Sequence, residues 1–441
     1  MMRRWWMIGF MAAIGLAVVR TAPIGAKETA PSENEEIYKE LELFEHALSI
    51  VRSDYVEEPK AKDLIYGALK GMLSTLDPYS QFMDPDSYNE LKVDTEGEFG
   101  GLGIEITIKD ELLTVITPID GTPAARAGLQ PGDRIVKIDG ELTRGITLLE
   151  AVKKLRGKPK TSVTLTVFRD GETELKEVAM ERAIIVIESI REAKILEDRI
   201  GYIKVSDFRE KTTDDLESAL KKLKEQGMDS LILDLRYNPG GLLDVAVTVS
   251  ELFLRRNQVV VSTKGRLRNQ NQEMRARGDG LVNDLPLVVL INEGSASASE
   301  IVAGAMQDHH RGIVMGTKSH GKASVQTIFP LRDGSALRLT TSKYFTPDGR
   351  SIHGQGILPD VDVPFEKPRP EEEAKKSDQS KELFNRIESG EPAKKEEEKV
   401  DPTKPVADTR TDNQLARAVD LLKGIRVYQL EGKNKERTAM N

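Results

Sequence analysis

Two short turns of small residues contain side chains that could do acyl-transfer chemistry. The first, at residues 294–300, reads GSASASE, and the second, at residues 321–326, reads GKASVQ. A serine hydroxyl is a weak nucleophile until a neighbouring group takes its proton. A lysine buried in apolar surroundings has a lowered pKa and can act as that base near neutral pH. The two turns therefore fit a Ser-Lys pair, a recognised variant of the serine hydrolase arrangement.

The segments beside the first turn indicate how it is positioned. Residues 285–291 form a continuous apolar run that predicts a buried strand, and residues 300–306 predict a helix. A serine between a strand and a helix lies on a sharp, exposed turn, where the first N–H groups of the helix have no helical partner. Those N–H groups can bind an oxyanion. Residue types alone leave two other interpretations open: an ordinary Ser-rich turn, and a triad that uses His320 or His353.

A second strand-to-turn pattern lies upstream. Residues 233–241 read LDLRYNPGG, which predicts a strand that ends in a Gly-Gly turn before a helix. Glycine pairs permit the close approach of another backbone or a ligand. From the residues alone, a plain strand-to-helix turn is the preferred explanation of this pattern.

Together these motifs resemble the carboxyl-terminal processing (tail-specific) protease family. The resemblance rests on NEGSASASE at residues 292–300, Gln307–Asp308 and GKASVQ at residues 321–326. It implies that Ser297 is the nucleophile, that Lys322 is the base and that Gln326 orients the lysine. Ala323 stands where the family usually has glycine, and we expect modest strain there without loss of activity.

The same resemblance assigns the oxyanion hole and an upstream domain. It implies that the N–H of Ala298 and one from the Gly-Gly turn, Gly240 or Gly241, hold the oxyanion. Residues 121–135, GTPAARAGLQPGDRI, resemble the most recognisable stretch of a PDZ domain. Such domains bind a peptide C-terminus at a Gly-rich loop, and here the loop residues are Gly101, Leu102, Gly103 and Ile104.

Arg156 ends the expected PDZ helix and could link bound peptide to the protease. A cation beside a glycine helix cap, without any role in peptide binding, is an equally good explanation.

Two other motifs are set aside. Residues 316–322 match most of a phosphate-binding loop, but Ala323 replaces the Ser or Thr that binds magnesium, and a strand is expected next. His309 and His310 lack the spacing of a helical zinc motif. We expect no cofactor and no metal, because Ser-Lys acyl transfer needs neither.

Length and composition limit the remaining possibilities. The 441 residues suffice for two or three domains, and the absence of cysteine excludes a disulfide scaffold and cysteine catalysis. The net charge of −8, without a basic stripe, argues against nucleic acid as a partner.

The N-terminus has the pattern of an export signal. Arg3 and Arg4 precede the apolar run 5–19, and Ala26 follows as a cleavage position. Ile24 is a poor residue three positions before cleavage, so a retained membrane anchor is the alternative, although the run is short for a span. We expect an exported protein, in the periplasm or on the outer face of the cytoplasmic membrane of a bacterium.

Helices are expected at both ends of the mature chain. Apolar residues from Ile37 to Tyr55 recur at four- and three-residue spacing, and residues 64–76 form a second amphipathic pattern. Such a seam packs on its own chain or pairs two subunits, so a homodimer through the terminal helices is one expected partner state. Residues 367–411 are rich in charge and proline and indicate a flexible segment. Asp412 can cap a last helix.

The sequence therefore predicts a multidomain α/β serine endopeptidase with an inserted, permuted PDZ-like domain and a helical N-terminal region. Its substrates would be proteins with free, apolar C-termini, with or without an adaptor lipoprotein. The rival hypothesis is a non-catalytic peptide-binding scaffold, which would not need Ser, Lys and Gln in register. The expected divisions are 1–26 (signal peptide or anchor), 34–96 (helices), 97–182 (PDZ-like domain), 183–365 (protease core), 366–411 (charged segment) and 412–441 (last helix and tail).

Overall fold

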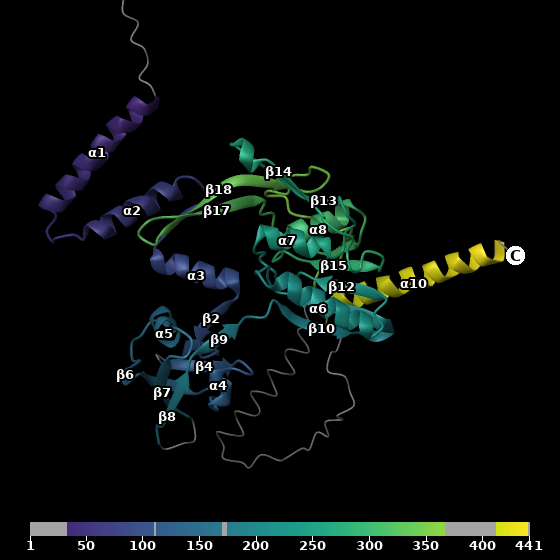
Figure 1. Ribbon diagram of the computed structural model, residues 1–441, viewed down its shortest axis with the longest axis horizontal. Helices are drawn as coiled ribbons and strands as arrows, with labels where there is room; N and C mark the ends of the chain where they lie inside the picture. The colour runs from purple at the N-terminus through teal and green to yellow at the C-terminus, as the bar shows by residue number, and fades with distance from the viewer. Residues whose placement is uncertain (1–32, 110–111, 170–173, 367–411, 440–441) are drawn as a thin grey trace, which may run out of the picture. The chain divides into compact units, whose positions relative to one another are not determined.

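The computed structural model describes residues 33–109, 112–169, 174–366 and 412–439 (Figure 1). The predicted export segment and residues 367–411 of the charged segment lie outside these ranges. The helices are α1 Glu33–Asp54, α2 Ala61–Ser74, α3 Pro85–Glu96, α4 Pro123–Arg126, α5 Leu148–Leu155, α6 Thr212–Glu225, α7 Leu243–Glu251, α8 Ala298–Asp308 and α10 Asn413–Ala439, with short 3₁₀ turns η1 Glu197–Arg199 and η2 Arg268–Gln270.

The strands form four sheets. They are β1 Gln81–Met83, β2 Glu98–Gly101, β3 Ile104–Lys109, β4 Leu112–Pro118, β5 Arg134–Ile138, β6 Glu141–Leu142, β7 Ser162–Phe168, β8 Lys176–Glu181, β9 Ala183–Val186, β10 Ile190–Ile195, β11 Ile200–Val205, β12 Ser230–Asp234, β13 Val259–Gly265, β14 Gln272–Arg275, β15 Leu287–Ile291, β16 Ile313–Gly316, β17 Ser324–Pro330, β18 Ala336–Phe345 and β19 Val361–Asp362.

The chain divides into two compact units, and the first comprises the N-terminal residues up to Leu69. It contains α1 and the start of α2. The predicted apolar seam is present on α1, where Ile37, Leu41 and Phe44 are exposed in the single chain. None of the described helices combines the length and apolar character that a membrane span requires.

The central sheet of the second unit has the order β10-β11-β12-β15-β16-β19. All neighbours are parallel except β10, which runs antiparallel to β11. Every residue of β12 and β15 is buried, as expected for parallel strands covered on both faces. The strand predicted for residues 285–291 is thus confirmed as β15.

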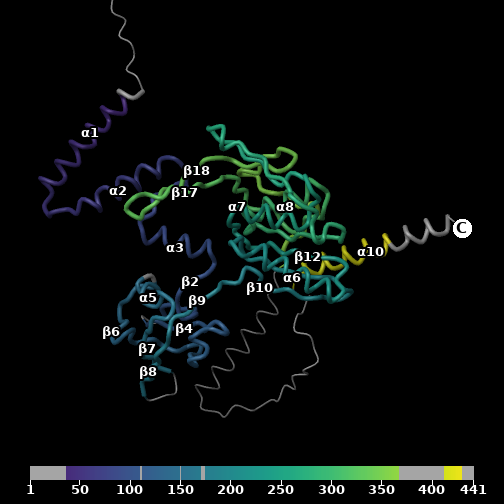
Figure 2. The backbone as a smooth tube through the Cα atoms, in the orientation of Figure 1, coloured from purple at the N-terminus to yellow at the C-terminus, as the bar shows by residue number. Residues whose placement is uncertain are grey.

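Helices cover both faces of this sheet. On one face, α6, α7 and α8 share a core with residues such as Leu233 and Val289, which alternate with the residues of the other face. On the other face, α10 begins near β12 (Figure 2) and packs four apolar residues at helical spacing: Leu415, Ala418, Val419 and Leu422. The predicted cap of α10 is confirmed, because Asp412 Oδ1 accepts a hydrogen bond from Leu415 N–H at 3.0 Å.

A second, antiparallel sheet has the order β1-β18-β13-β14, and β17 also pairs with β18. β17 begins at Ser324, directly after the GKA residues of the second turn. β1 pairs with β18 through the register Gln81 with Arg338. This pairing places the turn before β1 beside β18, the partner of the strand β17 that follows the expected lysine base.

Residues 102–181 include a small β domain with its own core. The sheet order is β3-β4-β5-β7-β8, with β6 on β5, and the core includes Leu113, Ile135, Leu165 and Ala151 of α5. The ladder between β2 and β9 pairs the strands that precede and follow this domain.

Candidate active site

Ser297 lies where the strand–turn–helix pattern placed it. It is the N-cap of α8, directly after the turn that follows β15, and its side chain is half-buried. Its backbone has φ 55° and ψ −113°, a conformation that L-residues rarely adopt. Such strained backbone persists only where the surrounding structure holds it in place, and it is concentrated at functional sites.

Glu300 provides much of that support, because its buried carboxylate joins the two turns. Oε2 accepts hydrogen bonds from Ser297 N–H at 2.8 Å and from Lys322 N–H at 3.0 Å. Oε1 accepts from Gly321 N–H at 2.7 Å and from the Ser319 hydroxyl at 2.5 Å. With 0% exposure, this one side chain fixes the backbone of both expected catalytic residues relative to each other.

Lys322 is half-buried, and its environment favours the neutral amine. Burial, and then the positive charge of Arg338, lower the pKa of Lys322 below its usual value of 10.5, while Glu300 acts in the opposite direction. The Nζ atom lies 4.7 Å from the centroid of the Tyr79 ring, in a cation–π position. Tyr79 belongs to the turn just before β1.

The structure does not align the expected catalytic groups completely. Within the described residues, no hydrogen bond joins the Ser297 hydroxyl to the Lys322 amine. Gln326 Nε2 donates to Ser324 Oγ at 2.8 Å, and not to the lysine. Rotation about the side-chain bonds of Lys322 and Gln326 would be needed to form the hydrogen bonds that the resemblance implies.

The Gly-Gly turn lies directly against Ser297. A Cβ atom added to Gly240 would lie 2.8 Å from Ser297 Cβ and 2.9 Å from Ala298 N, and Gly240 has φ +100°. Only glycine satisfies both conditions. This contact excludes the interpretation of a plain strand-to-helix turn remote from the serine.

The available N–H groups differ between the two glycines. Gly240 N–H donates to Asn238 Oδ1 at 2.9 Å. Gly241 is exposed, and its N–H has no acceptor within the described residues. Ala298 N–H, at the first position of α8, likewise has no acceptor there, as expected for the start of a helix.

Ala323 does not introduce the strain that we expected. It is fully buried and does not have positive φ, so its methyl group is accommodated without a left-handed backbone. The neighbouring backbone is held by Tyr344, whose hydroxyl donates to the carbonyl oxygens of Ser297, at 3.0 Å, and of Lys322. Burial raises the pKa of Tyr344 well above 10, so it remains a donor.

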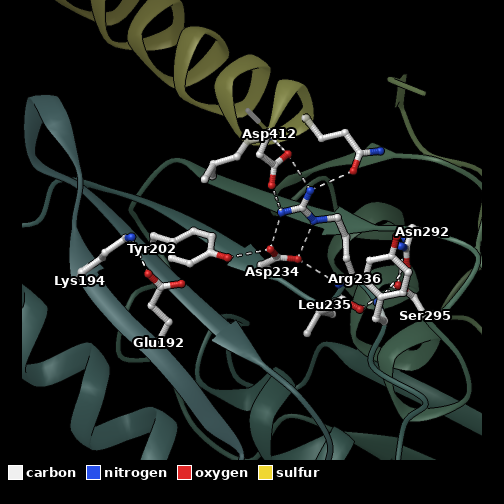
Figure 3. Close-up of polar contacts among 12 residues, drawn as sticks. Glu192, Lys194, Tyr202, Asp234, Leu235, Arg236, Asn292, Ser295 and Asp412 are labelled. Atoms are coloured by element: carbon white, nitrogen blue, oxygen red, sulfur yellow. Dashed lines mark hydrogen bonds and ion pairs between the residues drawn. The ribbon is translucent and has the colours of Figure 1, made fainter. Parts of the chain in front are cut away.

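A polar network behind the Gly-Gly turn fixes the backbone that leads into it (Figure 3). The Arg236 guanidinium donates to both oxygens of Asp234 and of Asp412, and Tyr202 donates its hydroxyl to Asp234 at 2.8 Å. Next to it, the Ser295 hydroxyl donates to Leu235 O at 2.8 Å. The start of α10 is therefore bonded to the segment that carries the two glycines.

A cleft of about 500 Å³ contains the expected site residues. It is lined by Ser297, Lys322, Gln326, both glycines of the turn, Arg338, Tyr344 and apolar side chains that include Leu242, Ile301 and Val325. His320 and His353 are exposed and do not line it, which argues against the histidine triad. The described residues hold no group of three or more side chains suited to bind a metal ion.

A separate pocket lies in the small β domain. Its lining includes all five residues expected to bind peptide, namely Gly101, Leu102, Gly103, Ile104 and Arg156, together with Phe99, Ile106, Val152 and Leu155. The N–H groups of Leu102 and Gly103 have no acceptor in the described part of the chain. The Arg156 guanidinium lies 4.4 Å from the centroid of the Phe99 ring.

The sequence did not predict the contacts that Glu300, Tyr79 and Arg338 make around Lys322. Glu300 belongs to the first motif, and Ser297-x-x-Glu300 has the spacing of a capping box, which could have indicated its contact with Ser297. Tyr79 and Arg338 gave no local signal, because they reach the site only through the pairing of β1 with β18.

Comparisons with known proteins agree with this geometry. Residues 199–363 match the model of peptidase family S41, residues 114–169 match a PDZ domain, and residues 14–87 match the N-terminal domain of the activating protease CtpB. A carboxy-terminal-processing protease of Bartonella bacilliformis is 44% identical over 368 residues, which cover 82% of this chain and 83% of the relative.

A second curated relative and one solved structure are also similar to this chain. A probable CtpA-like serine protease of Staphylococcus haemolyticus is 37% identical and is matched over 79% of this chain and 69% of its own. The solved photosystem II D1 C-terminal processing protease is 30% identical, with a TM-score of 0.44, and the match covers 72% of this chain and 86% of that one. The 44% identity to the Bartonella protease, over 83% of its length, shows that the chain belongs to peptidase family S41, as a carboxy-terminal-processing serine endopeptidase with a PDZ domain.

Proposed function

We propose that this enzyme cleaves peptide bonds by a Ser-Lys acyl-enzyme mechanism. Ser297 is the nucleophile, Lys322 is the general base and Gln326 orients the lysine amine. The observation that carries the proposal is the Glu300 clamp, which holds the backbone of Ser297 and Lys322 on the two oxygens of one buried carboxylate at the edge of the cleft. A neutral amine beside the hydroxyl is the requirement for this chemistry.

The proton transfers of the reaction follow from these roles. When the Ser297 oxygen attacks the scissile carbonyl carbon, its proton passes to Lys322 Nζ. The resulting ammonium gives that proton to the leaving nitrogen as the peptide bond breaks. Water then attacks the acyl-enzyme in the same way, and Lys322 returns the proton to Ser297. The amine and Gln326 first rotate from the positions described above.

The oxyanion is bound by backbone donors. We assign Gly241 N–H and Ala298 N–H, since both lack an acceptor within the described residues, whereas Gly240 N–H donates to Asn238. Each such donor contributes about 2.7–4 kcal/mol to transition-state stabilisation in comparable hydrolases. Gly240 serves the site by permitting the close approach to Ser297.

The decisive experiment is cleavage of an unfolded protein by purified enzyme and by its Ser297→Ala and Lys322→Ala variants. Both variants should lose activity and keep the wild-type unfolding temperature within a few degrees. Ser299→Ala is the matched control: its hydroxyl donates to Asn238 O at 2.9 Å and lies outside the proposed chemistry. Proteolysis by folded Ser297→Ala protein at the wild-type rate would overturn the assignment.

The PDZ pocket is proposed to receive the free C-terminus of the substrate. Leu102 and Gly103 present N–H groups to the carboxylate, and Ile104, Ile106 and Val152 accept an apolar last side chain. A peptide with a free, aliphatic C-terminus should bind at least about tenfold more tightly than its amide, since charge-assisted hydrogen bonds are each worth about 1.5–3 kcal/mol. Equal affinity in calorimetry would contradict this assignment.

The Arg156→Ala variant distinguishes two roles of the PDZ domain: tethering of substrate and gating of the protease. If the domain gates, Arg156→Ala should change the cleavage rate more than peptide affinity; if it only tethers, both should change little. Both the cleavage rate and the affinity are measured with the free-acid peptide and its amide.

Location and assembly complete the proposal. We propose export across the cytoplasmic membrane, from the charged and apolar pattern of residues 1–26, with cleavage of the signal or its retention as an anchor. The exposed seam of α1 supports a homodimer through terminal helices, and an adaptor lipoprotein is a further partner to test. Cell fractionation with N-terminal sequencing would test the location and the fate of the signal. Sedimentation of an Ile37→Asp/Leu41→Asp variant, compared with wild type, would test the dimer.

A further inference from the structure

Arg338 is a second cation in the catalytic cleft, and the acyl-transfer steps above do not use it. It lies on β18, half-buried, and lines the same cleft as Ser297 and Lys322. Its Nε donates to Tyr79 O at 3.3 Å. No carboxylate within the described ranges forms an ion pair with it, which is unusual because a half-buried guanidinium loses much of its hydration.

The turn before β1 brings Arg338 and Lys322 together. The carbonyl oxygen of Tyr79 accepts a hydrogen bond from Arg338, and the Lys322 amine lies over the Tyr79 ring. The turn is pinned to β18, because Asp77 Oδ1 accepts from Tyr79 N–H at 2.7 Å and from the Thr340 hydroxyl at 3.2 Å. Both cations therefore contact the same, firmly held residue.

We propose that Arg338 is a positioning residue for the acyl-transfer reaction: it is bound to Tyr79, which the Lys322 amine also contacts, and its permanent positive charge keeps that amine in the proton-accepting form. The proposal rests on the role of Lys322 as the general base. A guanidinium is suited to this task, since it stays charged at every pH at which the enzyme would work.

The other charged groups around Lys322 make this contribution necessary. Glu300 faces the lysine from α8 and favours its protonated form, as does the Tyr79 ring. Tyr344, on β18, is neutral. Burial and Arg338 act in the opposite direction and lower the pKa of Lys322. Arg338 is therefore the one side-chain charge among the described residues that opposes protonation of the base.

The test compares Arg338→Gln with Arg338→Lys. A like charge close to a titrating group shifts its pKa by about one unit or more. In Arg338→Gln the rising limb of the kcat/KM profile against pH should therefore move upward by about one pH unit, with roughly tenfold lower activity below the limb. Arg338→Lys, which keeps the charge, should restore most of the wild-type profile.

Lys343→Gln is the matched control, because it removes one positive charge from an exposed position of the same strand. Its profile should not move. If the role of Arg338 were only structural, Arg338→Gln would lower kcat/KM by the same factor at every pH, and a higher pH would not restore it. Superimposable profiles for Arg338→Gln and wild type would overturn the proposal.

A second measurement does not depend on catalysis. In the Ser297→Ala background, the rate of Lys322 acetylation against pH reports the fraction of neutral amine, and mass spectrometry identifies the modified residue. Arg338→Gln should shift this titration upward by about one unit. If wild type is proteolytic and Lys322→Ala is fully active, the proposed base is wrong. If Lys322→Ala is inactive and the acetylation titration is unchanged by Arg338→Gln, only the role of Arg338 is wrong.

Discussion

Replacing Glu300 with glutamine tests whether one carboxylate aligns the nucleophile and the base. Glutamine keeps the shape but has one acceptor oxygen and one donor NH₂ group. The NH₂ group fits best on the Ser319 side, because the Ser319 hydroxyl can rotate to accept, whereas Gly321 N–H then loses its acceptor. The oxygen can still accept from Ser297 N–H and Lys322 N–H, now without the help of a negative charge.

The magnitude follows from these contacts. One unpaired buried N–H costs about 1–3 kcal/mol, and each of the two remaining bonds loses about 1 kcal/mol of charge assistance. The neutral amide is easier to bury than a carboxylate, which offsets part of this loss. We expect Glu300→Gln to lower the free energy of unfolding by about 2–4 kcal/mol. A shift of the Lys322 backbone by about 1 Å would lower kcat/KM by roughly 100-fold.

Urea unfolding and a peptidase assay measure the two effects in the same samples. Glu293→Gln is the control, because Glu293 lies in the turn before Ser297 and is exposed, and its carboxylate accepts a long hydrogen bond of 3.3 Å from the Thr317 hydroxyl. It should change stability by no more than about 0.5 kcal/mol. If Glu300→Gln kept the free energy of unfolding within about 0.5 kcal/mol of wild type and kcat/KM within twofold, the idea of a carboxylate clamp would be refuted.

Three further predictions concern the surroundings of this clamp. Gly240→Ala should lower kcat/KM by about 100-fold or more, because its methyl group would displace Ser297; Gly278→Ala, which meets nothing within 4 Å, should be silent. In wild type, kcat/KM should rise with pH along a limb with a midpoint below 10.5, since the neutral base is populated above a lowered pKa; a midpoint at or above 10.5 would contradict the burial of the amine. Burial raises the pKa of Asp412, but the hydrogen bonds and the charge of Arg236, with backbone hydrogen bonds, together lower it by more, so that the net pKa is below 3.8. The contribution of Asp412 to stability should therefore be present at neutral pH and be lost as the pH falls below 3.8. Asp412→Asn should accordingly cost about 1–3 kcal/mol in urea unfolding at pH 7 and progressively less as the pH falls below 3.8. Asp420→Asn, at an exposed site of the same helix, should change stability little at any pH.

Local patterns in the sequence determined the elements that carry the site. The apolar run that became β15, the small-residue turn at Ser297 and the Gly-Gly turn each predict their structure from a few adjacent residues, because burial and backbone freedom act over that range. The cap of α10 at Asp412 was predictable for the same reason. The resemblance to a protease family likewise depended on short motifs, above all those at residues 292–300 and 321–326.

The tertiary structure alone decided which groups surround the lysine and which backbone donors are available. Tyr79 and Arg338 approach Lys322 because β1 pairs with β18, a contact between segments far apart in the chain. The proposal that Gly241, and not Gly240, donates to the oxyanion rests on the hydrogen bond from Gly240 N–H to Asn238. The sequence predicts the nucleophile and the base through a family resemblance, which rests on local motifs. The electrostatic surroundings of the base depend on long-range pairing, which no local pattern encodes.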